Sequence, residues 1–184
     1  ENIYKYKMQT YSCPNGCCKI YVNSYTPTKG SMYKRRNRRK AGVFIEDTPH
    51  NKVLLIQSNG NMWGPPKGTT KYGETDRNCA VREVEEETGL QISPNEFTKA
   101  INIQNKAIYF YVQRDICFVE IPTKYIDNDV TGITWINPDC LEQCIVNGNI
   151  KLSQHCRIVF YRFCNRIFSP TSTFTLVNRH KCRF

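Results

Sequence analysis

Apolar residues gather in short runs along most of the chain, and these runs predict β-strands. Runs at 41–45 and 53–57 flank a polar turn at 48–51 that contains Pro49. Val, Ile, Leu and Phe fill both runs, and bounded apolar runs of this length are typical of paired strands. Similar runs follow at 101–103, 107–112, 116–121 and 132–136. The pattern therefore predicts a sheet as the main element of the chain.

Residues 1–40 show a weaker pattern. Short alternations of β-branched and aromatic residues at 3–6 and 20–22 predict a hairpin, separated by a cysteine-containing turn. We interpret 1–40 as a basic, Cys-containing N-terminal extension. Residues 63–68 hold two consecutive prolines, which remove hydrogen-bond donors and predict extended backbone.

The last third of the chain changes to steps of three and four, the spacing of one helix face. After Pro138, we expect Asp139 to cap a short helix that runs through Val146. Apolar residues at 152, 156, 159, 160, 163, 164 and 167 predict a second helix within 152–168. Residues 169–184 are interpreted as a tail. Strands, a helix with a loop before it, more strands and a closing helix predict an α/β fold with a mixed sheet between helices.

One further helix is predicted between Gly73 and Gly89, and it is rich in glutamate. Thr75 or Asp76 can cap its first turn, and Gly89 supplies the left-handed residue that ends it. Ala80, Val81 and Val84 form an apolar strip that would dock the helix on a core.

The carboxylates of this helix are the leading candidates for chemistry. Because a helix turns ~100° per residue, Glu83, Glu86 and Glu87 project from one side, whereas Glu85 points away. Three like charges on one stripe repel each other unless a cation lies among them, and hard oxygen ligands favour Mg²⁺ or Mn²⁺. A solvated acidic face is the ordinary alternative.

The residues around these glutamates follow a long fixed pattern, G-x5-E-x7-R-E-U-x-E-E-x-G-U, where U is apolar. Its fixed positions are Gly68, Glu74, Arg82, Glu83, Val84, Glu86, Glu87, Gly89 and Leu90. The pattern resembles the signature of the Nudix hydrolase family. That resemblance implies an α/β/α Nudix sandwich over about 41–168, and cleavage of a nucleoside diphosphate linked to another group.

The resemblance also implies roles for individual residues. Glu83, Glu86, Glu87 and the backbone carbonyl of Gly68 would hold the metal. Glu74 and Arg82 would be structural, with Arg82 orienting the glutamates. Either Glu86 or a carboxylate from a later loop would serve as general base.

A narrower resemblance is to the catalytic subunit of eukaryotic mRNA-decapping enzymes. It rests on W-G-P-P-K-G at 63–68 and C-A-V-R-E-V-E-E-E-T-G at 79–89. Members of that group carry a glutamate six positions before a tryptophan near the end of the core, and here Asp129 stands six before Trp135. Asp129 is therefore a candidate further ligand or base, with Glu120 and Asp127 as substitutes.

Cap recognition requires aromatic faces, because a positively charged methylguanine base gains from stacking and cation–π contact. Trp63, Tyr72 and the aromatic residues at 109–111 are candidates, although strand alternation makes at least half of them core residues. Lys67 is expected to contact phosphate.

Some residues depart from the decapping pattern. Pro65 also resembles the P-P-K-G of dinucleoside tetraphosphate hydrolases, and Thr70 stands where decapping enzymes often carry a basic residue. The group's N-terminal regulatory domain has no counterpart here. The short chain and basic surface resemble compact decapping enzymes that some large DNA viruses encode.

The chain has 184 residues and a formal net charge of +10, from 26 basic and 16 acidic residues. This length fits one domain with a modest extension. No segment approaches the ~18 apolar residues of a membrane span, so an intracellular, cytoplasmic protein is expected. A run of six cations in seven positions favours RNA contact: Lys34, Arg35, Arg36, Arg38, Arg39 and Lys40. A solvated run or a nuclear-entry signal is the alternative.

The ten cysteines are scattered, and we expect most of them to be reduced and buried. Cys13-Pro-Asn-Gly-Cys17-Cys18 stands apart. Cys13 and Cys17 could be ligands of a structural zinc, with His180 and Cys182 as imaginable partners, but the second half of a regular zinc motif is not evident. An ordinary tight turn is the alternative.

These observations lead to one expected function. The chain is expected to be a metal-dependent Nudix pyrophosphohydrolase that removes the 5′ cap from mRNA, releasing methylated GDP and 5′-monophosphate RNA. Capped RNA is the expected partner; no membrane and no obligatory protein partner are expected. Hydrolysis of dinucleoside polyphosphates or diphosphoinositol polyphosphates, and a non-catalytic RNA-binding module, are the alternatives.

Overall fold

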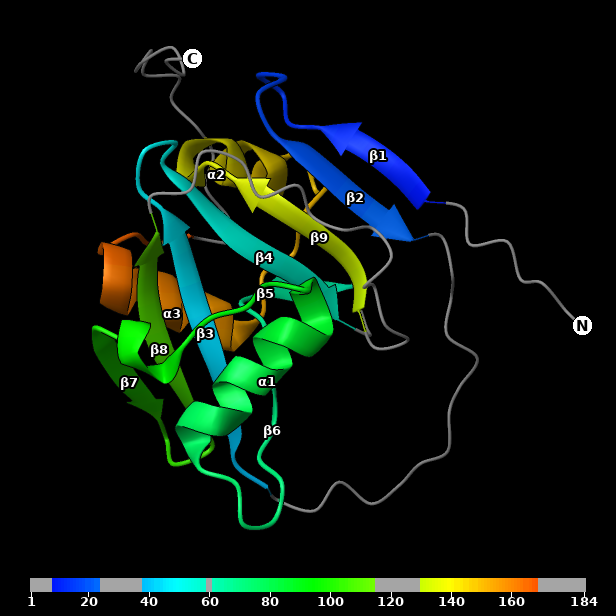
Figure 1. Cartoon of the computed structure of the whole chain (residues 1–184). Coiled ribbons are helices and arrows are strands. Elements are labelled where there is room, and N and C mark those ends of the chain that lie inside the picture. The colour runs from blue at the N-terminus through cyan, green and yellow to red at the C-terminus, as the bar shows by residue number, and fades with distance from the viewer. Residues whose placement is uncertain (1–7, 24–37, 59–60, 115–129, 169–184) are drawn as a thin grey trace, which may run out of the picture.

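The computed structural model describes residues 8–23, 38–58, 61–114 and 130–168, and these form one nine-stranded sheet flanked by helices (Figure 1). Along the sheet the strand order is β1-β2-β9-β4-β3-β8-β7, with β5 paired to β4 and β6 paired to β3. The strands are β1 Met8–Ser12, β2 Lys19–Asn23, β3 Lys40–Asp47, β4 Lys52–Ser58, β5 Met62–Gly64, β6 Lys67–Thr69, β7 Lys99–Ile103, β8 Ala107–Arg114 and β9 Val130–Ile136. Only β3 and β8 pair in parallel among them, so the predicted mixed sheet is confirmed.

Helices lie on both faces of this sheet. The helix α1, Asp76–Thr88, covers one face, and α2, Pro138–Val146, and α3, Gln154–Cys164, lie behind the other (Figure 1). A short 3₁₀ helix, η1, spans Pro94–Glu96. Because successive side chains of a strand point to opposite faces, β3 sends Val43 and Ile45 toward α1 and Phe44 toward α3. Two apolar cores result, and the α/β/α class predicted from the sequence is confirmed.

The N-terminal hairpin is an integral part of the sheet. Strands β1 and β2 pair antiparallel. Strand β2 also pairs antiparallel with β9, through the pairs Ile20–Thr134, Tyr21–Ile133 and Val22–Gly132. The second strand was predicted at 20–22. Residues 3–6, predicted as its partner, lie outside the described residues, and β1 supplies that strand instead. The boundary between extension and domain near residue 40 stays a prediction.

Two details of the helical predictions were wrong. Asn137, rather than Asp139, caps α2, because its side chain accepts a hydrogen bond from the backbone of Asp139. The helix α3 ends at Cys164, since Asn165 adopts a left-handed conformation with φ of 52°. The strand predicted at 116–121 and the tail at 169–184 lie outside the described residues. No helix in the described ranges is long and apolar enough to cross a membrane.

Candidate active site

The candidate site lies where β6 leads into α1 (Figure 1). Strand β6 pairs antiparallel with the start of β3, which fixes Gly68 opposite Ala41. The chain then turns through Gly73 and enters α1 at Thr75, whose hydroxyl accepts a hydrogen bond from the backbone N–H of Asn78 at 3.2 Å. At the other end Gly89 has a φ of 72°. Both predicted ends of the helix are confirmed.

Gly68 lies directly against the carboxylate of Glu83. A Cβ atom placed on Gly68 would lie 1.9 Å from Cδ of Glu83 and within 2.1 Å of both of its oxygens. These separations are far inside van der Waals contact, which for carbon atoms is ~3.5–4.0 Å. Only glycine therefore allows the β6 backbone and this glutamate to come so close. The metal-ligand roles predicted for Gly68 and Glu83 stay predictions.

Arg82 joins the end of β6 and the segment between β6 and α1 to α1 itself through its guanidinium group. Nε and one terminal nitrogen hold Glu74 at 2.8 and 3.0 Å, and the same terminal nitrogen donates to the carbonyl oxygen of Thr69 at 3.3 Å. The other terminal nitrogen donates to Glu83 at 2.6 Å and to Glu86 at 2.8 Å. The side chain is about one-fifth exposed, at 20%. Arg82 thus contacts two of the three glutamates, and its predicted role in orienting them stays a prediction.

Glu86 and Glu87 complete the acidic group. Glu87 accepts a hydrogen bond from the backbone N–H of Lys67 at 2.7 Å, so its carboxylate faces the segment that carries Gly68. Glu86 is 50% exposed, and the ammonium group of Lys71 lies 3.7 Å from its second oxygen. Glu85 points away, as predicted, and is contacted by the side-chain amide of Gln91. The three carboxylates thus occupy one side of α1, facing the β6 loop.

The pKa values in this group depend on burial and on Arg82. The guanidinium lowers the pKa of Glu74 from 4.5 to about 2, because it forms two hydrogen bonds to the ionised carboxylate. Burial raises the pKa of Glu83 above its ordinary value, since its desolvation outweighs the attraction of Arg82. Hydrogen bonds to the carboxylates raise the pKa of Arg82 itself, so it stays charged.

Comparison with known proteins identifies the family to which the domain belongs. A family model of the NUDIX domain matches residues 36–156, about two-thirds of the chain. The chain belongs to the Nudix family. A putative hydrolase, 111R of Invertebrate iridescent virus 3, is 33% identical over 157 residues, which cover 81% of this chain and 91% of the relative. Family membership makes the chain a hydrolase of pyrophosphate bonds.

Two other relatives carry decapping names. The m7GpppN-mRNA hydrolase of Saccharomyces cerevisiae is 29% identical over 61% of this chain, but the match spans only 12% of that protein. The mRNA-decapping protein g5R of African swine fever virus is 34% identical over 46% of this chain and 40% of its own length. Among solved structures, the E. coli dihydroneopterin triphosphate pyrophosphohydrolase superposes with a TM-score of 0.53 at 16% identity, over 71% of this chain and 97% of its own. That likeness shows the fold.

The residues of the Nudix site fit a divalent metal ion. Nudix enzymes generally use divalent metals such as Mg²⁺ or Mn²⁺. The donor set consists of carboxylate oxygens from one helix face, with the Gly68 segment held against them because it lacks a Cβ. Carboxylate and carbonyl oxygens are the ligands that these hard cations prefer. When bound, such an ion neutralises phosphate charge and helps generate the attacking hydroxide.

The predicted substrate-binding residues lie in very different surroundings. Trp63 is 1% exposed, and its indole packs beside Gly132 of β9. No face of this ring is open to a base, so the stacking role predicted for Trp63 is replaced by core packing. The aromatic residues of β8 at 109–111 are buried as well. Tyr72, by contrast, is fully exposed in the loop before α1, and Lys67 is half-buried beside the acidic group.

His155 is a neighbour of the site that the sequence did not reveal. It lies in the first turn of α3, and its ring nitrogen Nδ1 lies 3.3 Å from the hydroxyl of Tyr109. Burial lowers its pKa, and the positive charges of Lys40, Lys67 and Lys106 lower it further. The backbone N–H of Lys40 donates to the carbonyl of Lys106 at 3.0 Å, and Lys67 pairs with Gly42, so these three cations lie at one end of the sheet. They come from distant parts of the chain, so spacing could not have indicated them.

The basic run is only partly described. Arg38 is exposed, whereas Arg39 forms an ion pair of 2.9 Å with Asp76 and a hydrogen bond to Asn102. Lys40 begins β3. Three residues of the run, Lys34, Arg35 and Arg36, lie outside the described residues, as do Asp129 and its substitutes Glu120 and Asp127. Their predicted roles stay predictions.

Proposed function

We propose that this chain is a metal-dependent decapping Nudix hydrolase, which cleaves capped RNA into methylated GDP and 5′-monophosphate RNA. The observation that carries the proposal is the group of three carboxylates on α1 facing Gly68, in a chain whose relatives include enzymes named for mRNA decapping. The net charge of +10 suits a long polyanionic substrate better than a single nucleotide. A cytoplasmic location goes with this proposal.

Each carboxylate has a distinct place in the proposed reaction. Glu83, Glu87 and the carbonyl of Gly68 would hold Mg²⁺ or Mn²⁺ at the β6–α1 junction. Glu86, the most exposed of the three carboxylates, would both bind metal and accept the proton of the attacking water. Arg82 would position Glu83 and Glu86, to which it already donates hydrogen bonds.

The phosphate chain and the RNA require cations and an aromatic surface. Lys67, whose backbone N–H donates to Glu87, would bind the phosphate groups of the cap, together with Lys40 and Lys106, which lie at the same end of the sheet. Tyr72 is the predicted aromatic residue whose ring is open to a base, and it lies in the loop that joins β6 to α1. Stacking on one aromatic ring is worth about 1–3 kcal/mol per base. Arg38, exposed at the start of the described core, would contact the RNA backbone.

The test compares three substrates under identical metal conditions. Cap-labelled RNA, diadenosine tetraphosphate and a diphosphoinositol polyphosphate are each incubated with the chain and Mg²⁺ or Mn²⁺. The expected product is labelled methylated GDP from the RNA, with little turnover of the two small molecules. Glu86→Gln should reduce the rate by at least about 100-fold, since general-base catalysis contributes ~10²–10⁴.

Glu85→Gln is the matched control, because it removes the same charge from the same helix on the side away from the site. Its rate should stay near that of the unmodified chain. Preferential cleavage of either small molecule would replace the proposal with the corresponding alternative. Binding of RNA without any product in any metal would indicate a non-catalytic RNA-binding module. An equal loss of rate in Glu85→Gln would show that the rate depends on the total charge of the helix and not on Glu86 itself.

A further inference from the structure

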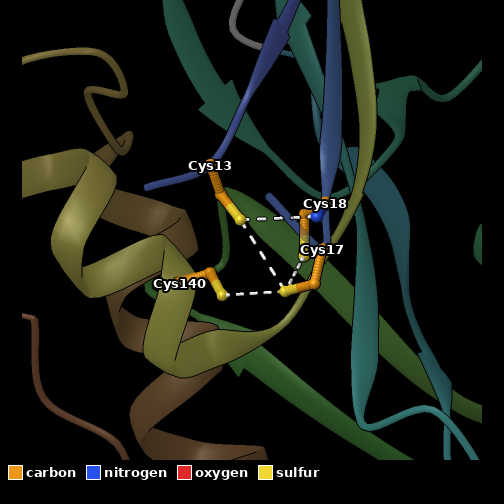
Figure 2. Close-up of side chains that lie close together, drawn as sticks. All are labelled: Cys13, Cys17, Cys18 and Cys140. Carbon is orange, nitrogen blue, oxygen red and sulfur yellow. Dashed lines mark hydrogen bonds between the residues drawn. The ribbon is translucent and has the colours of Figure 1, made fainter. Parts of the chain in front are cut away.

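Four cysteine side chains converge at the edge of the sheet, far from the residues assigned to catalysis. Cys13, Cys17 and Cys18 lie in the turn between β1 and β2, and Cys140 projects toward them from α2 (Figure 2). Their four sulfur atoms all lie within 4.8 Å of one another. Three of the side chains are buried, and Cys17 is partly exposed. No disulfide links any of the eight cysteines that the structure describes.

The distances between these sulfur atoms suit a shared metal ion. The sulfur of Cys17 lies 3.7 Å from that of Cys13, 3.6 Å from that of Cys18 and 3.4 Å from that of Cys140. Four thiolates around a tetrahedral zinc, with Zn–S bonds of about 2.3 Å, stand ~3.8 Å apart. A disulfide would require about 2.05 Å. The spacing therefore matches thiolate ligands rather than disulfide partners.

Hydrogen-bond donors already point at the sulfur atoms. The backbone N–H of Cys18 donates to Cys13 at 3.3 Å, and that of Asn137 donates to Cys18 at 3.3 Å. The side-chain amide of Asn15 donates to Cys140 at 3.5 Å. Such contacts stabilise thiolates and orient metal ligands. Cys140 also lies in the first turn of a nine-residue helix, whose positive end favours a thiolate.

We propose that Cys13, Cys17, Cys18 and Cys140 bind one structural zinc ion, which fastens the N-terminal hairpin to α2. Soft thiolate ligands in a closed tetrahedral set select zinc over the hard cations of the catalytic site. Binding displaces four protons from the thiols and leaves the site with a formal charge of −2. Lys52, whose ammonium group donates to the carbonyl of Cys17 at 3.2 Å, places a positive charge beside it.

This site differs from the one considered from the sequence. A second close pair of cysteines is unnecessary, because the turn itself supplies three ligands and Cys140 supplies the fourth. His180 and Cys182, the partners first considered, lie outside the described residues. The zinc would strengthen the attachment of the hairpin to the rest of the fold, because β2 pairs with β9 through only three residue pairs. The inference is independent of which pyrophosphate bond the enzyme cleaves.

The test measures bound metal in the whole chain. The chain is purified under reducing conditions without chelator, and its metal content is determined by mass spectrometry. We expect roughly one zinc per chain in the unmodified protein, falling below about one-fifth in Cys140→Ser and Cys17→Ser. Cys144→Ser is the matched control, because Cys144 is buried one turn further along α2 and outside the group. Glu83→Gln should also retain zinc, which separates this site from the catalytic one.

A second measurement does not depend on the variants folding. A zinc-selective chelator added to the unmodified chain should lower its melting temperature, and added zinc should restore it. Cobalt substitution should give the visible absorption bands of a tetrahedral thiolate site. An unmodified chain that takes up no zinc after refolding in its presence would overturn the proposal. So would iron in its place, a disulfide between Cys17 and Cys140, or equal zinc in Cys140→Ser and Cys144→Ser.

Discussion

Replacing Gly68 with alanine tests the geometry of the active site most directly. The added methyl group would lie 1.9 Å from Cδ of Glu83 and within 2.1 Å of its oxygens. The backbone of Gly68 is not in the left-handed region, so alanine meets no conformational strain there. The nearest atoms that the methyl group meets belong to the flexible end of one side chain. The substitution therefore displaces a single carboxylate.

The size of that displacement predicts the effect. Restoring ordinary carbon–carbon contact, ~3.5 Å, requires the carboxylate to move by about 1.6 Å. Metal ligation tolerates only ~0.2 Å, and a 1 Å misplacement in an active site can cost about 100-fold in rate. We expect kcat/KM to fall by at least about 100-fold. The free energy of unfolding should stay within about 1 kcal/mol, because Gly→Ala at a compatible position is mildly stabilising.

Two assays separate these outcomes. With the proposed substrate, the release of methylated GDP from cap-labelled RNA would give kcat/KM, and chemical denaturation gives the free energy of unfolding. Thr69→Ala is the control, since Thr69 is the next residue of β6 and its side chain is exposed. Combining Gly68→Ala with Glu83→Asp should cost less than the product of the two single effects, because the shorter side chain yields to the methyl group. Unchanged kcat/KM in Gly68→Ala would refute the reasoning, as would a loss matched by unfolding.

Three further substitutions have expected outcomes. Arg82 lowers the pKa of Glu74 from 4.5 to about 2. The ionised carboxylate therefore stabilises the fold by at most about 3 kcal/mol at pH values above about 4.5, its pKa in the unfolded chain. This contribution is lost as the pH falls toward 2. Glu74→Gln should remove this dependence of the free energy of unfolding on pH, as measured by denaturation between pH 5 and pH 2. Asn137→Ala should lower the free energy of unfolding by about 1 kcal/mol through loss of the α2 cap, as measured by denaturation. Gly42→Ala should cost about 1–3 kcal/mol in the same assay, because its methyl group would lie 2.6 Å from the carbonyl oxygen of Pro66, where the backbone must move.

The sequence predicted the features that depend on neighbours along the chain. The caps of α1 at Thr75 and Gly89 are confirmed because both use contacts within a few residues. The strands β3, β4, β8 and β9 and the class of the fold follow from apolar runs of the correct length. The placement of the three glutamates on one side of α1 follows from helical periodicity alone.

Features that depend on contacts between distant segments could not be predicted in this way. Cys140 is 122 residues from Cys18 in the sequence, and only the pairing of β2 with β9 brings α2 near the turn. His155 and Tyr109 are likewise distant in the sequence and meet only because α3 packs against the sheet. Trp63 has an aromatic ring that could stack on a base, but whether that ring is exposed depends on how α3 and β9 pack against it. The alternation of side chains along a strand does not show which face of the strand other elements will bury.

The arrangement around Arg82 would let the acidic group hold a divalent cation although an arginine lies within it. Glu74 occupies Nε and one terminal nitrogen, so a single terminal nitrogen remains for both Glu83 and Glu86. The four carboxylates of Glu74, Glu83, Glu86 and Glu87 have a formal charge of −4 when ionised. Arg82 and Lys71, the cations paired with them, return +2. A divalent ion such as Mg²⁺ or Mn²⁺ would reduce this excess of negative charge, and Glu74 keeps most of the arginine away from Glu83 and Glu86.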